Sequence, residues 1–441
     1  MKRSFEHPKR RLPPGPSNTL YWTYRFAKAP IETHQTLAKK YGDPFTLPLL
    51  AGRGLITGRP ELIKQIYGAP PSTFEPYTSL LPLVGSSSLF VSSGERHLRD
   101  RRLFAPLFHG SRLATYVPAM RATLAAEVDK LRDGALFDIL ETTQRLSFAI
   151  MAVTGFGMET REEVRELETT LAAILTSVPS FFLFFPILQR PLFGRGPWDK
   201  FLAARARFDT LLFAAIRKRR DAPNESIVSR MFELERTTGE KLTDEEIRDQ
   251  LVTLLLGGYE STAIAMAWMF YAVARDAKVQ ERLREEARSL PSDAAWKDVD
   301  KLPYLNAVFL ESTRRFPAVP QTTRLVGAHF ELDQYTFEKG ETVAASLILA
   351  HWNESRYPDP MRFDPARFED TKLDMTTWLP FGGGARRCIG ASLAECEAKV
   401  LLTTLLRSHR LVAEPGLVPN LVRRTLVLGP EWPLRVASHK I

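Results

Sequence analysis

A ten-residue stretch near the C-terminus, Phe381–Gly390, combines glycine, arginine and cysteine in a pattern that could do chemistry. It reads Phe-Gly-Gly-Gly-Ala-Arg-Arg-Cys-Ile-Gly. Consecutive glycines let the backbone adopt angles that are closed to other residues, or pass close to a large flat group. The run from Ala391 to Leu402 has the apolar periodicity of a helix. Cys388 is therefore expected just before a helix N-terminus, where free N–H groups favour a thiolate, the form that binds metals or acts as a nucleophile.

The composition limits the kinds of protein that this chain can be. Its 441 residues are 44% hydrophobic, which allows a sizeable core. The two cysteines, Cys388 and Cys396, are separated by roughly 12 Å if the chain between them is mostly helical, which is too far for a disulfide. Two cysteines are also too few for an iron–sulfur cluster or a cysteine-rich zinc site. We expect a reducing, cytoplasmic compartment, with Cys396 as an ordinary helix residue.

The chain carries a net charge of +9, which bears on its partners. We find neither a basic stripe interleaved with aromatic residues nor a nucleic-acid-binding module, so no nucleic-acid partner is expected. A basic face could instead dock an acidic electron-transfer protein. Residues 1–11 are basic and lack an apolar stretch, so we expect a disordered N-terminus there, not a signal peptide or membrane anchor. Residues 12–441 are expected to form a single domain.

A second chemical feature lies in the middle of a long apolar segment. Thr243-Asp-Glu-Glu has the form of a capping box, and a buried helix is expected from Ile247 to about Ala274. Its centre reads Leu256-Gly-Gly-Tyr-Glu-Ser-Thr, where a carboxylate is costly unless it has a function or a partner. The position of Glu260 at the centre of the run argues against a membrane-spanning helix. Glu260 is therefore either a functional acid or one that is satisfied by a salt bridge in the core.

Two pairs of side chains have helical spacing. His97 and Arg101 are four positions apart and share one helix face, which suits an anionic partner such as a carboxylate. Glu311 and Arg314, three positions apart, can form an ion pair. By spacing alone, the first pair could belong to a solvated helix and the second to a surface salt bridge of small energy.

The pattern F-x-x-G-x-R-x-C-x-G, which fixes five residues in ten, resembles the haem-binding loop of the cytochrome P450 family. Without that resemblance, the same stretch could be a glycine-rich turn with a buried structural cysteine. The resemblance covers nearly the whole chain, from about Leu12 to Val436. Four motifs occur in the family's order: 97–101, 257–262, 311–314 with Arg367, and 381–390.

The resemblance implies a mainly α fold with a small β lobe. Haem b would lie between the long central helix, at about 247–274, and the helix that follows Cys388. The thiolate of Cys388 would be the axial ligand of the haem iron. The other cofactor-binding residues that it implies are His97 (more often Trp in the family), Arg101, Arg324 and Arg386 at the propionates, Phe381 and Gly382 beside the haem, and Gly257 and Gly258 at a groove for dioxygen.

Proton delivery is implied for the centre of the long helix. In the family, an acid and the alcohol beside it pass protons to bound oxygen, a relay form of general acid catalysis. Glu260 and Ser261 stand at these positions, with Thr262 after them. The family usually has threonine beside the acid, and serine keeps the hydroxyl with freer rotamers. The resemblance further implies a buried structural triad of Glu311, Arg314 and Arg367.

Several apolar segments are candidates for a substrate pocket. Residues 74–92 form an irregular apolar loop, either a packed connection or a lid, and its place in the family favours a lid. Residues 178–193 hold five phenylalanines, which form either core packing or the roof of an apolar channel. The candidate pocket residues are Leu81, Val84, Phe90, Phe182, Phe185, Leu254, Val319, Pro320, Gln321 and Leu426.

The resemblance implies a haem-thiolate monooxygenase of a bacterial type. It would use dioxygen to hydroxylate or epoxidise a lipophilic molecule such as a terpenoid, fatty acid or steroid. Electrons would come from NAD(P)H through a separate reductase and a ferredoxin- or flavodoxin-type donor, because the chain lacks a cysteine cluster and a G-x-G-x-x-G fingerprint. Arg387 is a candidate for docking that donor. The alternatives are a peroxide-driven peroxygenase, an isomerase-type member of the same fold, and a non-catalytic haem-binding protein.

Overall fold

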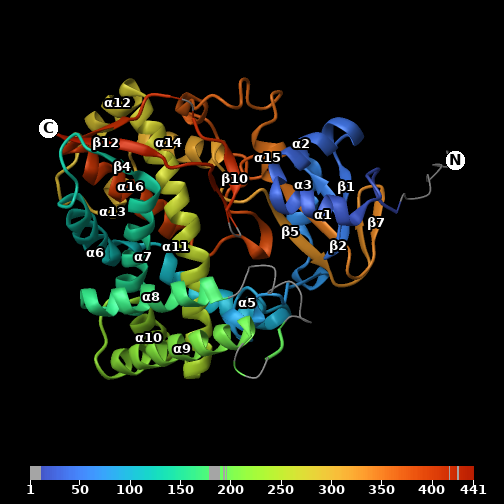
Figure 1. Ribbon diagram of the computed structural model, residues 1–441, viewed down its shortest axis with the longest axis horizontal. Helices are drawn as coiled ribbons and strands as arrows, with labels where there is room; N and C mark the ends of the chain where they lie inside the picture. Colours follow the sequence, from blue (N-terminus) through green and yellow to red (C-terminus); the bar gives the residue numbers. More distant parts are fainter. Residues whose placement is uncertain (1–10, 178–188, 192–193, 195, 417, 425–426) are drawn as a thin grey trace.

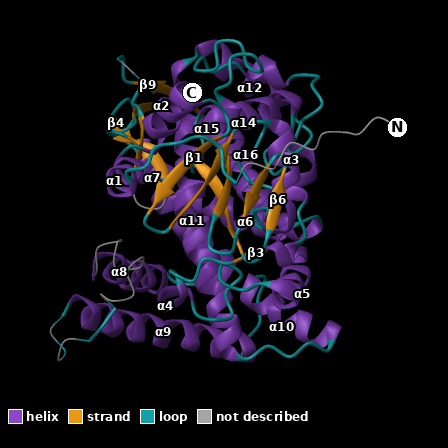
Figure 2. Ribbon diagram, turned by 90° about the vertical axis from the view of Figure 1, so that its right-hand side faces the viewer, coloured by secondary structure: helices purple, strands orange, loops and turns teal. Residues whose placement is uncertain are grey.

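Helices make up most of the protein, and most of the strands gather on one side of it. The computed structural model describes residues 11–177, 189–191, 194, 196–416, 418–424 and 427–441. In Figure 1 the N-terminal segments, in blue, meet later segments, in orange, within the β lobe. Figure 2 shows the strands in the upper half, with α8 (Arg161–Ser177), α9 (Pro197–Asp221) and α10 (Ile227–Thr238) at the lower end. The prediction of a mainly α fold with a small β lobe is confirmed.

The β lobe is built on a five-stranded sheet of order β1-β2-β8-β5-β3. Strand β2 pairs antiparallel with β1 and parallel with β8, so the sheet joins segments from the two ends of the chain. Strand β5 pairs antiparallel with both β8 and β3. The strands are β1 (Phe45–Leu49), β2 (Gly52–Thr57), β3 (Phe74–Glu75), β5 (Gln321–Val326) and β8 (Thr342–Ser346).

Short helices and smaller strand pairs complete this side of the molecule. Helix α1, which the sequence analysis did not predict, has Asn18 as its N-cap, whose side chain accepts a hydrogen bond from the Tyr21 N–H. The helices are α1 (Thr19–Lys28), α2 (Pro30–Tyr41), α3 (Pro60–Gly68) and α15 (Leu347–His351). The smaller sheets are β6 (Phe330–Leu332) with β7 (Tyr335–Phe337), and β10 (Leu421–Arg423) with β11 (Leu428–Pro430). A third sheet, β4 (Leu136–Asp138) with β12 (Arg435–Lys440) and β9 (His409–Ala413), lies on the helical side of the molecule (Figure 1).

The axis of the helical side is α11 (Asp244–Arg275), which runs through it from top to bottom in Figure 1. Its predicted capping box is present: the Glu246 N–H donates to Thr243 Oγ1 at 3.1 Å, and the Thr243 N–H donates to the Glu246 carboxylate at 3.0 Å. By length and composition this helix could cross a membrane, but more than half of its most apolar window is buried inside the protein. Its apolar surface is therefore accounted for by core packing.

The other helices surround this axis. Helix α7 is bound to it directly, because Thr143 Oγ1 donates to the Ala263 carbonyl at 2.9 Å. The surrounding helices are α4 (Leu81–Val84), α5 (Gly94–Phe104), α6 (Ser111–Val128), α7 (Ile139–Phe156), α12 (Ala277–Ser289), α13 (Trp296–Val299), α14 (Pro303–Arg315) and α16 (Ala391–Leu406).

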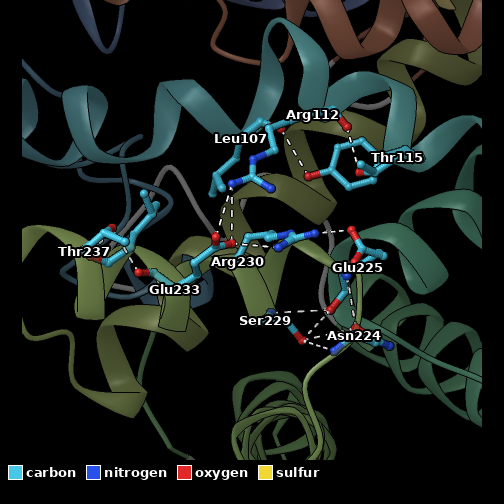
Figure 3. A network of polar contacts seen from close by, with 12 residues as sticks. Leu107, Arg112, Thr115, Asn224, Glu225, Ser229, Arg230, Glu233 and Thr237 are labelled. Carbon is cyan, nitrogen blue, oxygen red and sulfur yellow. Dashed lines mark hydrogen bonds and ion pairs between the residues drawn. The ribbon is translucent and has the colours of Figure 1, made fainter.

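A polar network fixes α10 against the start of α6 (Figure 3). Glu233 accepts hydrogen bonds from Arg230 at 2.7 Å and from Arg112, on α6, at 3.4 Å. At the start of α10, Asn224 donates its backbone N–H to Ser229 Oγ at 3.0 Å, and Arg230 also pairs with Glu225. The network joins two helices that are distant in sequence, and it lies apart from the residues singled out for chemistry.

Candidate active site

Cys388 lies two positions before Gly390, the N-cap of α16, as the sequence predicts. Its backbone N–H donates to the Phe381 carbonyl at 2.9 Å, which closes the loop. The thiol is exposed, whereas Cys396 is fully buried within α16. Burial nevertheless raises the pKa of the Cys388 thiol, while the Gly390 N–H and the charge of Arg101 lower it. The exposed thiol is therefore accessible as a ligand.

Phe381 packs against α14 and so holds the start of the Cys388 loop in place. Its ring stacks on Phe309 of α14, with 6.3 Å between the ring centroids, and lies 5.8 Å from the ring of Trp378. Trp378 is anchored in turn, because its Nε1 donates to the Leu310 carbonyl at 3.0 Å. These contacts place the Cys388 loop relative to α14.

The glycine run in this loop makes room for another part of the protein. A Cβ atom on Gly383 would lie 2.2 Å from Cδ2 of Tyr67, and one on Gly384 would lie 2.1 Å from the Tyr67 carbonyl oxygen. Gly382 and Gly384 also have positive φ angles of 63° and 65°. The sequence analysis gave two possible reasons for these glycines, backbone angles closed to other residues or close approach of a large flat group. The structure shows that two of them are required by Tyr67 of α3, a residue that the sequence analysis missed.

Four predicted anion-binding residues come together around the loop. His97, Arg324 and Arg386 line one pocket together with Tyr67. Arg386 donates to the carbonyls of Leu89 at 3.1 Å and Ser92 at 2.5 Å, and Arg324 donates to the Gly383 carbonyl at 3.1 Å. Desolvation, and then the charges of Arg324 and Arg101, lower the pKa of Arg386 to about 10. The Arg386 guanidinium is therefore close enough to those of Arg324 and Arg101 to be repelled by both.

The chemistry of this set fits a dianionic group. Within the described part of the chain, no carboxylate forms an ion pair with Arg101, Arg324 or Arg386. His97 is almost fully buried, and burial followed by the charges of Arg386, Arg101 and Arg324 lowers its pKa to about 4. Neutral His97 can donate one hydrogen bond without adding charge. Haem offers two carboxylates to the positively charged side chains and an iron to the accessible thiol, so it matches this set of residues.

The centre of α11 presents a polar face to accessible space. Gly257 is exposed and residues 258–261 are half-buried, although residues 247–253 and most of 262–274 on either side are buried. Ser261 Oγ donates to the Gly257 carbonyl at 2.7 Å. Thr262 is only 7% exposed, so it lies on the packed side of the helix, apart from Ser261. The helix is continuous here, without the local widening that its glycine pair permits.

The two glycines of α11 each face a neighbouring side chain. A Cβ atom on Gly257 would lie 2.9 Å from Cζ of Phe90, and one on Gly258 would lie 2.9 Å from Cε of Met151 on α7. Phe90 is 40% exposed, so the ring that touches α11 also faces accessible space. The structure thus brings together Phe90 and Gly257, two of the predicted site residues.

Glu311 and Arg314 form a fully buried, bidentate pair. Arg314 donates to the Glu311 carboxylate through Nε at 2.7 Å and Nη2 at 2.8 Å, and both side chains have no exposed surface. Arg367 Nε lies 3.6 Å from Glu311 Oε1, and Arg314 also donates to the His351 carbonyl at 2.8 Å. The three predicted members are therefore in contact. This arrangement ties α14 to the segments that precede the Cys388 loop.

The remaining pocket candidates differ in their surroundings. Leu81 is exposed, and Leu254, Val319 and Gln321 are half-buried. Val84 has no exposed surface and Pro320 is buried, so both pack within the protein and do not face accessible space. Phe182, Phe185 and Leu426 lie outside the described residues.

Three polar residues near the N-terminal end of α11 were also missed: Asp249, Gln250 and Thr253. All three are buried and bind the loop at 85–89. Polar residues at helical spacing in an otherwise apolar helix are a signal that could have found them, since burying them without partners is costly. The loop that they bind is a packed connection, the alternative to the favoured lid.

Comparisons with known proteins agree with this geometry. The family model described as Cytochrome P450 matches residues 12–434. Cytochrome P450 135A1 of Mycobacterium tuberculosis is 31% identical over 91% of this chain and 89% of its own length, and cytochrome P450 137 of that organism is 30% identical over 91% and 84%. The solved structure titled retinoic acid bound cyanobacterial CYP120A1 superposes with a TM-score of 0.83, at 24% identity, over 98% of this chain and 100% of its own. The chain belongs to the cytochrome P450 family and is a P450 monooxygenase.

Proposed function

We propose that this P450 hydroxylates or epoxidises a lipophilic small molecule, with Cys388 as the axial ligand of haem b. The observation that carries the proposal is the accessible Cys388 thiol beside three arginines that lack carboxylate partners among the described residues. Haem held by a thiolate supplies activation of dioxygen, and the thiolate favours O–O cleavage. The chain itself must hold this group, exclude water and supply protons.

The propionates of haem would be bound by Arg101, Arg324 and Arg386. Each guanidinium would gain a charged acceptor in place of the repulsion from its neighbours. His97 would donate one hydrogen bond as a neutral imidazole, because its pKa of about 4 keeps it uncharged near neutral pH. Binding of a dianion would thus relieve the repulsion that lowers the pKa of Arg386.

Proton delivery would use Glu260 and Ser261. The Ser261 hydroxyl is held on the Gly257 carbonyl and lies on the accessible face of α11. From there it could pass on a proton and receive another from the neighbouring carboxylate. Thr262 is buried on the other side of the helix, so we assign proton transfer to Ser261 and not to Thr262. Glu311, Arg314 and Arg367 would have a structural role.

A lipophilic substrate is favoured by the apolar side chains that face the accessible part of α11. Phe90, which is 40% exposed, lies against Gly257 there. A ligand-bound structure of the same fold holds retinoic acid, itself a lipophilic molecule. We therefore retain a terpenoid, fatty acid or steroid-like molecule as the substrate class.

Electrons would come from NAD(P)H through a separate reductase and a ferredoxin- or flavodoxin-type donor in the cytoplasm. The surface beside the Cys388 loop carries cations that suit an acidic partner. Burial, and then the charges of Arg387 and Arg101, lower the pKa of His109, so these groups lie near one another. His109 also contacts Ser392 at the start of α16, at 3.0 Å between Nδ1 and Oγ. Arg387 is the docking residue that we propose.

The ferrous carbon monoxide complex tests the assignment directly. Thiolate ligation gives a strongly red-shifted absorption band, and Cys388→Ala should abolish that band. A band that survives Cys388→Ala would overturn the axial ligand. Turnover with hydrogen peroxide alone, and none with ferredoxin, reductase and NAD(P)H, would overturn the monooxygenase reaction in favour of peroxygenase chemistry.

A further inference from the structure

A cavity lies where α11 ends and α12 begins, beside strand β9, and we call it the peripheral cavity. Its volume is about 480 Å³, within the usual range for sites that bind small organic molecules. Ala274, in the last turn of α11, lines it, and this residue lies roughly 20 Å along the helix from Ser261 at 1.5 Å per residue. The peripheral cavity is therefore separate from the proposed haem site, and Figure 1 shows α12 at the top of the helical side.

The floor of the peripheral cavity is buried and firmly held. Gln280 of α12 and Leu411 of β9 line it, and they are 4% and 1% exposed. The Leu411 N–H donates to Gln280 Oε1, and Gln280 Nε2 donates to the Leu411 carbonyl, at 2.8 Å each. These two hydrogen bonds join α12 to β9, so the floor is formed before any ligand arrives.

Arg284 adds a buried cation to the lining of the peripheral cavity. The residue is 6% exposed, its Nε donates to the Leu406 carbonyl at 3.2 Å, and its Nη1 donates to the Glu281 carboxylate at 2.5 Å. Its Nη2 is buried and has no hydrogen-bond partner within the part of the chain that the structure describes. A buried donor without an acceptor is costly, and a guanidinium binds a carboxylate best through two nitrogens. An anion in the peripheral cavity would supply the missing acceptor.

Two exposed arginines, Arg275 and Arg410, stand at the rim of the peripheral cavity. Arg275 donates to the Gly416 carbonyl at 3.0 Å, and among the described residues neither arginine forms an ion pair with a carboxylate. The carboxylates that line the cavity are already paired, Glu281 with Arg284 at 2.5 Å and Glu414 with Arg435 at 3.8 Å. Positive charge at the rim thus remains without a counter-ion, which favours an anionic ligand.

The remaining lining of the peripheral cavity is apolar and accessible. Ala277, Val412 and Pro415 line it and are exposed, with Val412 at 38%. An apolar body placed against these side chains would remove their surface from water, which stabilises the bound state. An inorganic ion would fill only a small part of 480 Å³ and would leave this surface wet.

We infer that the peripheral cavity is a second ligand site, which binds small organic carboxylates. The carboxylate lies between Arg284 and Arg410, and the apolar body lies against Ala277 and Val412. The site is independent of the proposed reaction, because none of these residues belongs to the haem-binding set or to the proton relay.

Equilibrium dialysis of naphthoate against the haem-loaded protein tests the inference. The protein is first saturated with phenylimidazole, which coordinates the haem iron and so occupies the proposed active site. Naphthoate should then bind saturably at one site without changing the absorption spectrum of the haem. It should bind at least about tenfold more tightly than naphthylmethanol, which has the same rings and no charge. Equal affinity of the two probes would overturn the anionic class of ligand.

Two variants place the bound naphthoate in the peripheral cavity. Arg410→Gln removes a rim charge and Ala277→Leu fills apolar space, and both positions are exposed, so both variants should fold. Each should weaken binding of naphthoate about tenfold, the loss expected for one charge-assisted contact or for a blocked apolar surface.

Arg288→Gln is the matched control. It removes the same charge from an exposed arginine of α12 that does not line the peripheral cavity, so binding of naphthoate should stay as in wild type. No saturable binding to wild type, equal weakening in Arg288→Gln, or wild-type affinity in both Arg410→Gln and Ala277→Leu would overturn the inference.

Discussion

The ring of Tyr67 fills the space beside the backbone of Gly383, so that an added Cβ atom at residue 383 would lie 2.2 Å from Tyr67 Cδ2. Tyr67 also contacts Thr322 at 2.7 Å between Oη and Oγ1, and the guanidinium of Arg324 lies 5.7 Å from the centroid of its ring. Tyr67 therefore connects α3 and β5 with the loop of the axial ligand. Arg324, a proposed propionate anchor, lies beside the Tyr67 ring, so its position depends on where that ring is held.

Gly383→Ala should destabilise the protein and impair haem binding, because the new methyl group would overlap the Tyr67 ring. Overpacking of this kind costs about 1–3 kcal/mol. The free energy of unfolding in urea and the haem content of the purified protein measure the effect. Gly68→Ala is the control, since a Cβ atom there has no neighbour within 4 Å and φ is not positive. Equal stability of the two variants would contradict the role of Tyr67.

Glu311→Ala should leave the Arg314 charge buried without its carboxylate. Breaking a buried pair in this way costs about 3–5 kcal/mol, which we expect to appear as loss of soluble, haem-loaded protein. Lys339→Ala is the control. Lys339 and Glu75 form an ion pair of similar length, 2.8 Å, but their side chains are 70% and 43% exposed. This substitution should change the free energy of unfolding by less than about 1 kcal/mol. A stable, haem-loaded Glu311→Ala protein would refute the structural role of the pair.

Ser261→Ala should keep haem and substrate binding but release reducing equivalents as hydrogen peroxide. The hydroxyl on the Gly257 carbonyl is lost, and we expect product formation to fall by at least about tenfold, at the lower end of the usual contribution of general acid catalysis. The ratio of peroxide to product per NAD(P)H consumed is the measurement. Ser261→Thr should restore coupling, and Thr262→Val should leave it unchanged. Normal coupling in both Ser261→Ala and Glu260→Ala would exclude the proton relay.

Glu397→Gln should stabilise the protein at neutral and alkaline pH. Glu397 is buried in α16, and burial raises its pKa to about 8, with a hydrogen bond from Ser147 acting in the opposite direction. Because the folded-state pKa lies above the ordinary value of 4.5, the unfolded chain loses this proton first, and stability falls as the pH rises from about 4.5 to about 8.

The difference in free energy of unfolding between Glu397→Gln and wild type isolates this titration. This difference should be smallest near pH 4.5 and about 3 kcal/mol larger at pH 7. Urea unfolding of both proteins at several pH values between these limits measures it. Parallel stability curves across that range would show that Glu397 titrates normally.

Local patterns were enough to predict the main helices of the site. The capping box at Thr243 starts α11, and the apolar periodicity after Gly390 marks α16. Each of these signals involves residues only a few positions apart, so it can be recognised before the fold is known. The identity of the family followed from the spacing of motifs around Cys388 and is confirmed.

The surroundings of these residues were harder to predict. The loop at 74–92 was expected to be a lid, and Val84 to face a pocket, because this apolar loop stands where the family has a substrate-facing one. The structure places Val84 in the core and binds the loop to α11. An apolar residue in a loop looks the same in sequence whether it faces a pocket or the core.

The sequence by itself determined the family, the helices of the site and the residues with the chemistry, because each depends on residues a few positions apart. Only the tertiary structure decided what surrounds them: that Tyr67 leaves no room for a side chain at Gly383, and that Asp249 holds the loop of Phe90. The contact of Tyr67 with Thr322 joins residues 255 positions apart, and that of Asp249 with Ser87 joins residues 162 apart. No local pattern records contacts of this length, because they exist only once the chain has folded.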